Sequence, residues 1–317
     1  MRSATASVPA RAHLAGNPSD GYGGAVLSTT VPSMAATVTA TDAPRVSIRG
    51  PEEQWDSLSE LAIATDRLGF EGGERLVRAA LLTLHGALDR TIERRPAVFA
   101  WSTTIPRSVG LGGSSAIVLA TMRAALQLWS AEDALDDLAL ASLALEAETG
   151  ALGIAAGIAD RTVQAIGGTV LTDARDGLTA APVPVREPVE LTLLWRPEAA
   201  APSGDYHRLL RSSFEAGDRT VGEGLARLAT FADDAETAVA TGDRSALARA
   251  MDSSLQTRRE LGPVPTAALE GVDDLRAAGV SVNFAGSGGA LVALGHSVPT
   301  TGWHTTPLVI GATEGAA

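Results

Sequence analysis

A glycine- and serine-rich turn, flanked by a strand-like run and a helix-like run, constrains the fold most. The strand-like run is AVFAWSTTI (97–105), the turn is PRSVGLGGSS (106–115), and apolar residues then recur with helical spacing to about Trp129. Glycine lets the backbone approach a ligand closely, and a helix that begins there directs unpaired N–H groups and its positive dipole end at that ligand. The stretch predicts a phosphate-binding turn, although a plain capped connection would have the same pattern.

Two familiar phosphate-binding patterns do not fit the chain. A Rossmann fingerprint has a third glycine where Ser115 stands, and an acidic residue at the end of the next strand, whereas Glu132 and Asp133 stand at a predicted helix start. All 25 basic residues are arginine, so neither a Walker A loop nor the strand lysine of protein kinases is available. Because there is no cysteine, thiol nucleophiles, disulfides and Cys-ligated zinc are also excluded.

Composition predicts a soluble globular protein. The 317 residues are 45% hydrophobic and 20% charged, which suits one large domain or two smaller ones. The net charge of −12 argues against a nucleic-acid partner. No apolar run reaches about 18 residues, so no membrane span is expected. Because the N-terminus lacks a basic-then-apolar signal, we expect a cytoplasmic protein.

Strand-like and helix-like runs alternate along the chain, and a proline-bearing link divides them. The link, near Pro182 to Pro188, predicts a domain boundary that separates residues 1–186 from 187–317. The polar stretch from Pro44 to Ser59 predicts a loop, and Ser130 with Asp133 predicts a capping box for a helix to about Glu148. The other predicted strands are 3–16, 25–42, 169–173 and 189–195, the other helices are 74–93, 207–216 and 221–241, and 280–295 reads as strand, glycine turn, strand.

Three separated segments resemble the motifs of the GHMP kinases, the superfamily of galactokinase, homoserine kinase, mevalonate kinase and phosphomevalonate kinase. The central family motif P-x-x-x-G-L-G-S-S-A resembles Pro106–Ala116, and the late glycine-rich turn resembles Gly286–Gly289 in FAGSGGALVA. Asp160, followed by Gly167 and Gly168, has the family's spacing. The first motif of the sugar kinases has its counterparts at Arg11, Gly16, Asp20, Gly23 and Gly24, with Ala10 in place of its first glycine.

Within this superfamily the chain is most similar to the glucuronokinase type. The similarity includes GNPSDGYGG, GLGGSSAIV, LGIAAGIADRTVQAIGG and SGDYHRLLRSSFEAGD, so it extends over nearly the whole chain. The resemblance implies a two-domain α+β fold. Residues 1–186 would form an N-terminal α/β ATP-binding domain, like domain 2 of ribosomal protein S5, and residues 187–317 a ferredoxin-like α+β domain, with the active site between them.

The resemblance also implies ATP and Mg²⁺ as cofactors. The ATP phosphates would lie on the backbone of residues 110–115, and Ser114 would reach the Mg²⁺. Glu148 is the expected acidic ligand of the Mg²⁺, with Glu146 as its competitor. The expected ATP-binding residues are Pro106, Gly110, Leu111, Gly112, Gly113, Ser114, Ser115, Ala116, Gly286, Ser287 and Gly288.

Asp160 and Arg11 are the expected catalytic residues. A carboxylate within hydrogen-bond reach of a sugar hydroxyl can orient it and accept its proton, whereas an arginine can act only electrostatically. Short polar groups on a turn suit a polyhydroxylated substrate, although they can also satisfy only their own backbone. The expected substrate-binding residues are Asn17, Ser19, Asp20, Tyr22, Gly23, Gly24, Arg161 and Gly289.

The implied reaction is ATP-dependent phosphorylation of the anomeric hydroxyl of a sugar, sugar acid or sugar phosphate, in a bacterial specialised-sugar or antibiotic pathway. A uronic acid would need an arginine near its carboxylate, and Arg161, Arg208 and Arg211 are candidates. A cyclitol kinase, a homoserine- or mevalonate-type kinase, a diphosphomevalonate-type decarboxylase and a non-catalytic sugar-binding module remain alternatives. We expect a monomer or a homodimer.

Overall fold

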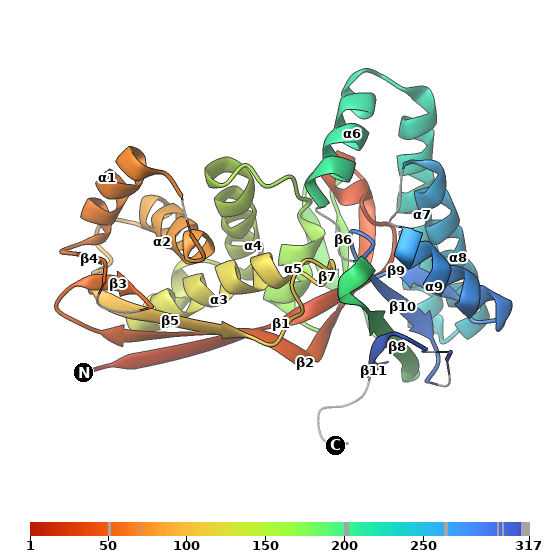
Figure 1. The fold of residues 1–317 in the computed structure, drawn as a ribbon, viewed down its shortest axis with the longest axis horizontal. Helices are drawn as coiled ribbons and strands as arrows, with labels where there is room; N and C mark the ends of the chain where they lie inside the picture. Colours follow the sequence, from red (N-terminus) through yellow and green to blue (C-terminus); the bar gives the residue numbers. More distant parts are fainter. Residues whose placement is uncertain are drawn as a thin grey trace.

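Two long antiparallel strands, β1 (Ser3–Ala15) and β2 (Ala25–Asp42), form the frame of the molecule. The computed structural model describes residues 1–49, 52–70, 72–199, 203–262, 266–296, 298–299 and 301–311. In these residues β1 and β2 belong to a seven-stranded sheet, and a four-stranded sheet lies beside it (Figure 1). The larger sheet has the order β4-β3-β5-β2-β6-β7 with β1 paired to β2; its other strands are β3 (Val46–Ile48), β4 (Gln54–Trp55), β5 (Ala97–Thr103), β6 (Thr169–Asp173) and β7 (Thr179–Pro182).

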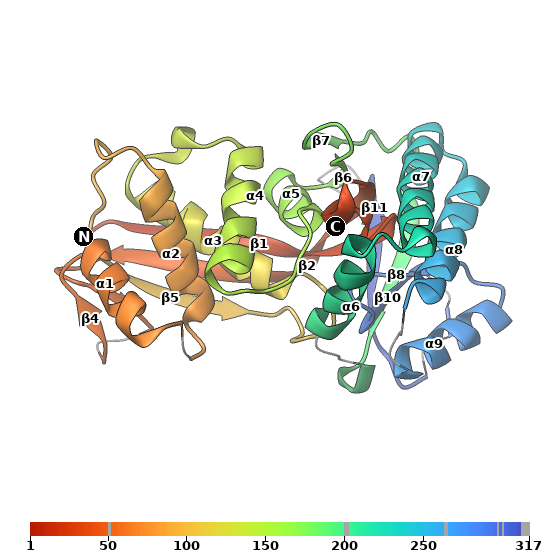
Figure 2. The ribbon, with the colours of Figure 1, turned by 90° about the horizontal axis from the view of Figure 1, so that it is seen from above.

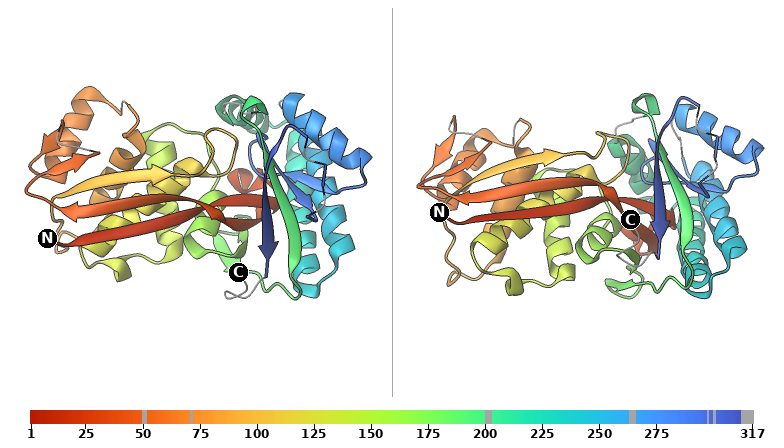
Figure 3. Two further views of the ribbon diagram at one scale, coloured as in Figure 1. Left: turned by 60° about the horizontal axis from the view of Figure 1, so that its bottom comes forward. Right: turned by 90° about the horizontal axis from the view of Figure 1, so that it is seen from below.

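The first half of β1 has one apolar and one polar face because its residues alternate. Ala6 and Val8 are buried, whereas Ser3, Thr5 and Ser7 are exposed. The three exposed hydroxyls pair with threonines of β2 across the strands, at 3.0 to 3.1 Å. Figure 3 shows this outer face of the sheet without a helical layer over it. One face can therefore pack on helices while the other meets water.

Helices cover the opposite face of the large sheet (Figures 1 and 2). The central helix α3 (Gly113–Leu128) is buried along most of its length, and it packs on β1, β2, α2, α4 and α5. Its apolar residues point in nearly every direction, as expected of a helix enclosed by other elements. The surrounding helices are α1 (Leu58–Leu68), α2 (Arg75–Ala87), α4 (Asp137–Glu146) and α5 (Ala159–Ile166).

The second half of β1 is buried on both faces. From Ala10 to Ala15 every residue is buried, because α7 (Arg219–Thr241), α8 (Arg244–Glu260) and β9 (Val282–Phe284) pack against β1 in addition to α3 and α5. The pairing of β1 with β2 shifts register between Pro9 and Ala10. The chain therefore carries the polar residues Arg11 and His13 into the interior, where their charge and hydrogen-bonding groups require partners.

The smaller sheet has the strand order β11-β8-β10-β9, and its three strand pairs are antiparallel in the described residues. Helices lie along the chain between β8 and β9, the first two strands of this sheet in sequence. Together with the strand order, this is the ferredoxin-like arrangement that the family resemblance implied for this half. Its strands are β8 (Val189–Trp195), β9 (Val282–Phe284), β10 (Ala290–Leu294) and β11 (His304–Ile310), and its helices are α6 (Ser203–Glu215), α7 (Arg219–Thr241), α8 (Arg244–Glu260) and α9 (Thr266–Ala277).

The predicted loop from Pro44 to Ser59 is wrong. The segment contains β3, β4 and the first residues of α1, because Val46, Ile48 and Trp55 are buried in the main core. The sequence did not indicate this packing, because the apolar residues here are few and lie between polar ones.

Two predicted helix limits also differ from the structure. The capping box at Ser130 does not form, since Ser130 has a φ of +53° and α4 begins after Asp136, whose carboxylate accepts the N–H of Ala139 at 2.7 Å. The helix predicted to reach Glu93 ends at Ala87. There the Arg94 guanidinium donates to the carbonyl of Leu88 at 2.7 Å, which helps to fold the chain back on itself.

The main hydrophobic core contains residues of both sheets, and a second cluster around Phe284 and Leu291 packs α9 on the smaller sheet. The main core includes Val38 of β2, Leu119 of α3 and Leu191 of β8. The boundary proposed between residues 186 and 187 lies in the link between β7 and β8, and it stays a prediction. In the described part of the chain, no helix has the length and apolar character that crossing a membrane requires.

Candidate active site

Asp160 and Arg11 meet as a nearly enclosed ion pair. Arg11, on β1, donates from Nε to Oδ1 of Asp160 and from Nη2 to Oδ2, both at 2.7 Å. Asp160 lies in the first turn of α5, and its side chain is 20% exposed. Burial alone would raise the pKa of Asp160, but Arg11 and His13 outweigh it and hold that pKa well below the ordinary value. The carboxyl group is therefore ionised near neutral pH.

His13 joins this pair, and the sequence analysis missed it. Its Nε2 lies 2.9 Å from Oδ1 of Asp160, and its Nδ1 lies 2.8 Å from Oγ of Ser28. Burial and the nearby Arg11 lower the pKa of His13 more than Asp160 raises it. The ring is thus neutral near pH 7. The sequence contained a signal for this contact. Arg11 and His13 are two residues apart on one strand, so their side chains point to the same face.

The two glycine-rich turns touch each other beside the ion pair. Arg11 Nη1 donates to the carbonyls of Gly110 and Ala285, at 2.6 and 2.8 Å, so one guanidinium holds both turns. A Cβ on Gly286 would lie 2.0 Å from the carbonyl oxygen of Gly110. A Cβ on Gly289 would lie 2.7 Å from Cα of Val109. Glycine is required at both positions because the two backbones are in contact.

Gln164, on α5, binds the glycine-rich turn through hydrogen bonds. Its amide nitrogen donates to the carbonyls of Pro9 and Gly112, and its oxygen lies 2.6 Å from Oγ of Ser115. Ser115 is fully buried, so its hydroxyl serves the turn's own structure. Ser114 and Gly113 are half-buried in the first turn of α3, Leu111 and Ala116 are buried, and Pro106 is half-buried after β5.

The turn expected to bind substrate, Gly16–Gly24, makes contacts in three directions. Asn17 donates to the carbonyl of Gly286 at 3.1 Å, and Asp20 accepts the N–H of Ala159 at 2.8 Å, one residue before Asp160. Ser19 donates to the carbonyl of Ala25, the first residue of β2 directly after the turn. The structure thus brings Asn17 to the second glycine turn and Asp20 to the start of α5, while Ser19 makes the local contact that such turns often contain.

Arg161 and Glu148 form a second buried pair next to the first. Both side chains are at most 3% exposed, and Arg161 donates from Nε to Oε2 of Glu148 at 2.9 Å and from Nη2 to the same oxygen. Arg161 also donates to the carbonyl of Gly157 and lies 3.8 Å from Asp160. The other carboxylate oxygen, Oε1 of Glu148, is buried without a hydrogen-bond partner. Glu146 is exposed.

Helix α6 reaches the same turn from the smaller sheet's side. Arg211 donates to the carbonyl of Gly21 at 3.0 Å, and its guanidinium lies 4.9 Å from the centre of the Tyr22 ring. Phe214 meets the same ring edge-on at 5.1 Å. Arg208 is exposed on this helix. Of the three arginines named from the sequence, Arg161 is fully engaged with Glu148, whereas Arg211 is 47% exposed beside Tyr22.

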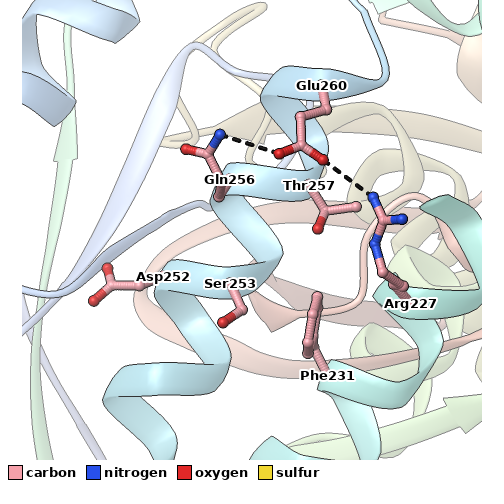
Figure 4. A pocket seen from close by; sticks show the side chains of 7 residues that line it. All are labelled: Arg227, Phe231, Asp252, Ser253, Gln256, Thr257 and Glu260. Atoms are coloured by element: carbon pink, nitrogen blue, oxygen red, sulfur yellow. Dashed lines mark hydrogen bonds and ion pairs between the residues drawn. The ribbon is translucent and has the colours of Figure 1, made fainter.

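A groove of about 480 Å³ lies between α7 and α8, and none of the expected site residues lines it (Figure 4). Its charged groups already have partners: Glu260 accepts from Arg227 at 3.1 Å and from Gln256 at 3.2 Å, and Asp252 accepts from the Ser281 hydroxyl at 2.8 Å. The contacts around Arg11 and Asp160 therefore describe the candidate active site better than this groove does.

Comparison with known proteins assigns the family. Glucuronokinase 1 of Arabidopsis thaliana is 30% identical over 300 residues, which cover 89% of this chain and 82% of that protein. The chain belongs to the GHMP kinases. The family region described as the GHMP kinases N terminal domain matches residues 75–168. This GHMP kinase is accordingly an ATP-dependent phosphotransferase.

Solved structures confirm the two-domain α+β fold of this GHMP kinase. A Lin0012 protein from Listeria innocua matches 99% of this chain and 100% of its own, with a TM-score of 0.78 and 18% identity. Lactococcus lactis galactokinase, solved in complex with galactose, matches 98% of this chain and 94% of its own, with a TM-score of 0.72 and 17% identity. At this identity the likeness concerns the fold.

Replacing Arg11 by lysine is expected to destabilise this kinase by about 3 kcal/mol, because a lysine cannot bind both oxygens of Asp160 and both carbonyls at once. The measurement is the free energy of unfolding from urea titration. The matched control is Arg219→Lys on α7, whose side chain is 89% exposed and whose change should stay within about 0.5 kcal/mol. Equal stability of the two variants would contradict this account of Arg11.

Proposed function

We propose that this kinase transfers the γ-phosphoryl group of ATP to the anomeric hydroxyl of a sugar or sugar acid and releases a sugar 1-phosphate. The observation that carries the proposal is the Arg11–Asp160 pair. Arg11 donates to the carbonyl of Gly110 in the glycine-rich turn. Asp160 directly follows Ala159, whose N–H donates to Asp20. A carboxylate, a cation and a phosphate-binding turn are thus within direct contact of one another.

The start of α3 suits the phosphates of ATP. Gly112 precedes the helix with a φ of +73°, and no side chain of the described residues caps this helix end. The first N–H groups of the helix therefore need acceptors, which phosphate oxygens supply. Gly110 has a φ of +83°, a conformation that glycine adopts without strain.

Asp160 and Arg11 divide the work on the reacting groups in this proposal. Phosphoryl transfer requires mainly alignment and charge stabilisation. Asp160 orients the acceptor hydroxyl and takes its proton as the hydroxyl oxygen bonds to the γ-phosphorus of ATP. The bond from that phosphorus to the β–γ bridging oxygen breaks, and ADP leaves. Because its pKa is held low, Asp160 acts by orientation and late proton acceptance more than by strong basicity. The Arg11 guanidinium supplies positive charge beside the transferred group.

Glu148 and Ser114 have the oxygen atoms that Mg²⁺ prefers. The buried, unpartnered Oε1 of Glu148 supports Glu148 as a ligand, since such an oxygen needs a cation or a donor. The described residues contain no group of three or more acidic or histidine side chains placed so that they could hold a metal ion, but Mg²⁺ commonly uses one or two protein ligands together with phosphates and water. Bound there, the ion would neutralise charge on the phosphates of ATP.

Replacing Glu148 by glutamine is expected to raise the Mg²⁺ concentration needed for half-maximal activity by about tenfold or more, because a charged ligand becomes a neutral one. ADP release at saturating ATP and increasing Mg²⁺ measures it. Glu146→Gln, two residues away and exposed, is the matched control and should leave the Mg²⁺ dependence unchanged. The reverse result would assign the metal to Glu146.

A sugar acid is the substrate class that the comparisons and the placement of the arginines favour. The Arabidopsis thaliana relatives are named Glucuronokinase 1 and Probable glucuronokinase 2, and the second is 29% identical over 301 residues. Arg211 donates to the carbonyl of Gly21 from Nη2, and its Nη1 lies 3.9 Å from Oε1 of Glu215 on the same helix, beyond hydrogen-bond distance. Because Arg211 is also partly exposed beside Tyr22, it has donors left for a substrate carboxylate. Arg161 would have to leave Glu148 to do the same.

ADP release across a panel of free sugars, uronic acids, sugar phosphates and cyclitols tests the proposal, with phosphorus NMR of the product. Turnover of a uronic acid, with phosphate on the anomeric oxygen, is the expected result. Phosphate on another oxygen, or turnover of cyclitols alone, would overturn the assignment. ATP binding without turnover of any compound would favour the non-catalytic sugar-binding alternative. A role in a bacterial specialised-sugar or antibiotic pathway remains an expectation from the sequence resemblance.

A further inference from the structure

We infer that His13 is a positioning residue for phosphoryl transfer: it occupies Oδ1 of Asp160 and so leaves Oδ2 as the oxygen that meets the acceptor hydroxyl. The inference rests on the proposed catalytic role of Asp160. It assigns a function to a side chain that none of the three family motifs contains, and it distinguishes the two oxygens of one carboxylate.

The hydrogen bonds of Asp160 differ between its two oxygens. Oδ1 accepts from Nε of Arg11 at 2.7 Å and from Nε2 of His13 at 2.9 Å. Oδ2 accepts from Nη2 of Arg11 at 2.7 Å, and the next cation, Nη1 of Arg161, lies at 3.8 Å, beyond hydrogen-bond distance. Since each carboxylate oxygen has about two acceptor positions, Oδ1 is saturated and Oδ2 has one position left.

Ser28 determines which ring nitrogen of His13 carries the hydrogen. The Ser28 hydroxyl lies 2.8 Å from Nδ1, on the side of the ring away from Asp160, and Ser28 is fully buried in β2. Nε2 faces a carboxylate and must donate, so in the neutral ring Nδ1 accepts from the Ser28 hydroxyl. The tautomer and the ring orientation are thereby fixed from the strand next to β1.

A neutral histidine suits this place better than a second cation. The charged groups around it are Arg11 on the same strand, Asp160 and Arg161 on α5, Glu148 before α5, and Asp20 in the turn after β1. Arg11 already matches the charge of Asp160. A second positive charge beside Asp160 would further weaken its affinity for the proton that it must accept. A neutral N–H orients the carboxylate without adding that charge.

The test is a pair of amides of different length. The side-chain nitrogen of glutamine in His13→Gln can reach the position of Nε2, whereas that of asparagine in His13→Asn is one methylene short. We expect kcat to fall by about 10- to 100-fold in His13→Asn, the effect of one hydrogen bond to a charged group, with the KM for ATP unchanged. His13→Gln should recover most of the loss, and Ser28→Ala should lower kcat by less than His13→Asn.

Thermal unfolding of each variant separates this role from a structural one. Equal kcat values in His13→Gln and His13→Asn, at melting temperatures within a few degrees of the unchanged protein, would overturn the inference. So would a complex with substrate and a non-hydrolysable ATP analogue in which the acceptor hydroxyl binds Oδ1. Full activity of Asp160→Asn would instead overturn the proposed function on which the inference rests.

Discussion

Asp160→Asn is expected to lower kcat by about 100- to 10,000-fold, the range associated with a positioned acid–base group. The asparagine amide has nearly the shape of the carboxylate but cannot accept a proton from a hydroxyl. One of its two ends also presents N–H donors to the Arg11 guanidinium, which approaches both oxygens at 2.7 Å. Single-turnover ADP release with the substrate found in the panel measures the loss of the chemical step.

Two further measurements make the Asp160 result decisive. Asp176→Asn, an exposed aspartate in the turn between β6 and β7, is the matched control and should keep full activity. Urea titration of both variants shows how much of the loss is due to unfolding, because the change at Asp160 leaves a buried cation without its anion. A folded Asp160→Asn variant with more than a tenth of the original kcat would exclude Asp160 as the proton acceptor.

Gly286→Ala is expected to destabilise the protein by about 3 kcal/mol, at the upper end of overpacking, and to raise the KM for ATP. The new Cβ would lie 2.0 Å from the carbonyl oxygen of Gly110 and 2.8 Å from Nη1 of Arg11. Neither backbone can move freely, because Arg11 binds the carbonyls of Gly110 and Ala285 on the two sides of the contact. The added methyl group therefore separates the two turns.

A glycine that meets no neighbour serves as the control for Gly286. Gly222 lies in the first turn of α7, and a Cβ there would have nothing within 4 Å. Gly222→Ala should leave the KM for ATP unchanged and stabilise the helix by up to about 1 kcal/mol. If Gly286→Ala retained the original stability and the original KM for ATP, contact between the two turns would not shape the ATP site.

The local patterns in the sequence were sufficient for the long strands and for several of the helices, but not for α8 or α9. The alternation in β1, the run of apolar residues in α3 and the strand VELTLLW (189–195) each follow from period and composition, and the structure confirms them. The motifs also identified Arg11, Asp160, Gly110 and Gly286, which are far apart in the chain and lie in contact in the fold. Motif residues can be far apart in the chain and still lie in contact, because they form one site.

The short elements between residues 44 and 59 could not be predicted in this way. These strands form because β3 pairs with β5 and because the side chains of Val46, Ile48 and Trp55 pack into the core. Runs this short have no periodicity that would predict them. The same limit applied at Ser130, where a capping pattern was present but the helix began at Asp137.

The sequence by itself determined the family, the positions of the long strands and of several helices, and which residues carry the motifs. Only the tertiary structure decided the partners of the buried polar groups: His13 with Asp160 and Ser28, Gln164 with the glycine-rich turn, and Arg161 with Glu148. The physical reason is that a buried charge or amide must find a partner, and the sequence does not state which distant segment supplies it.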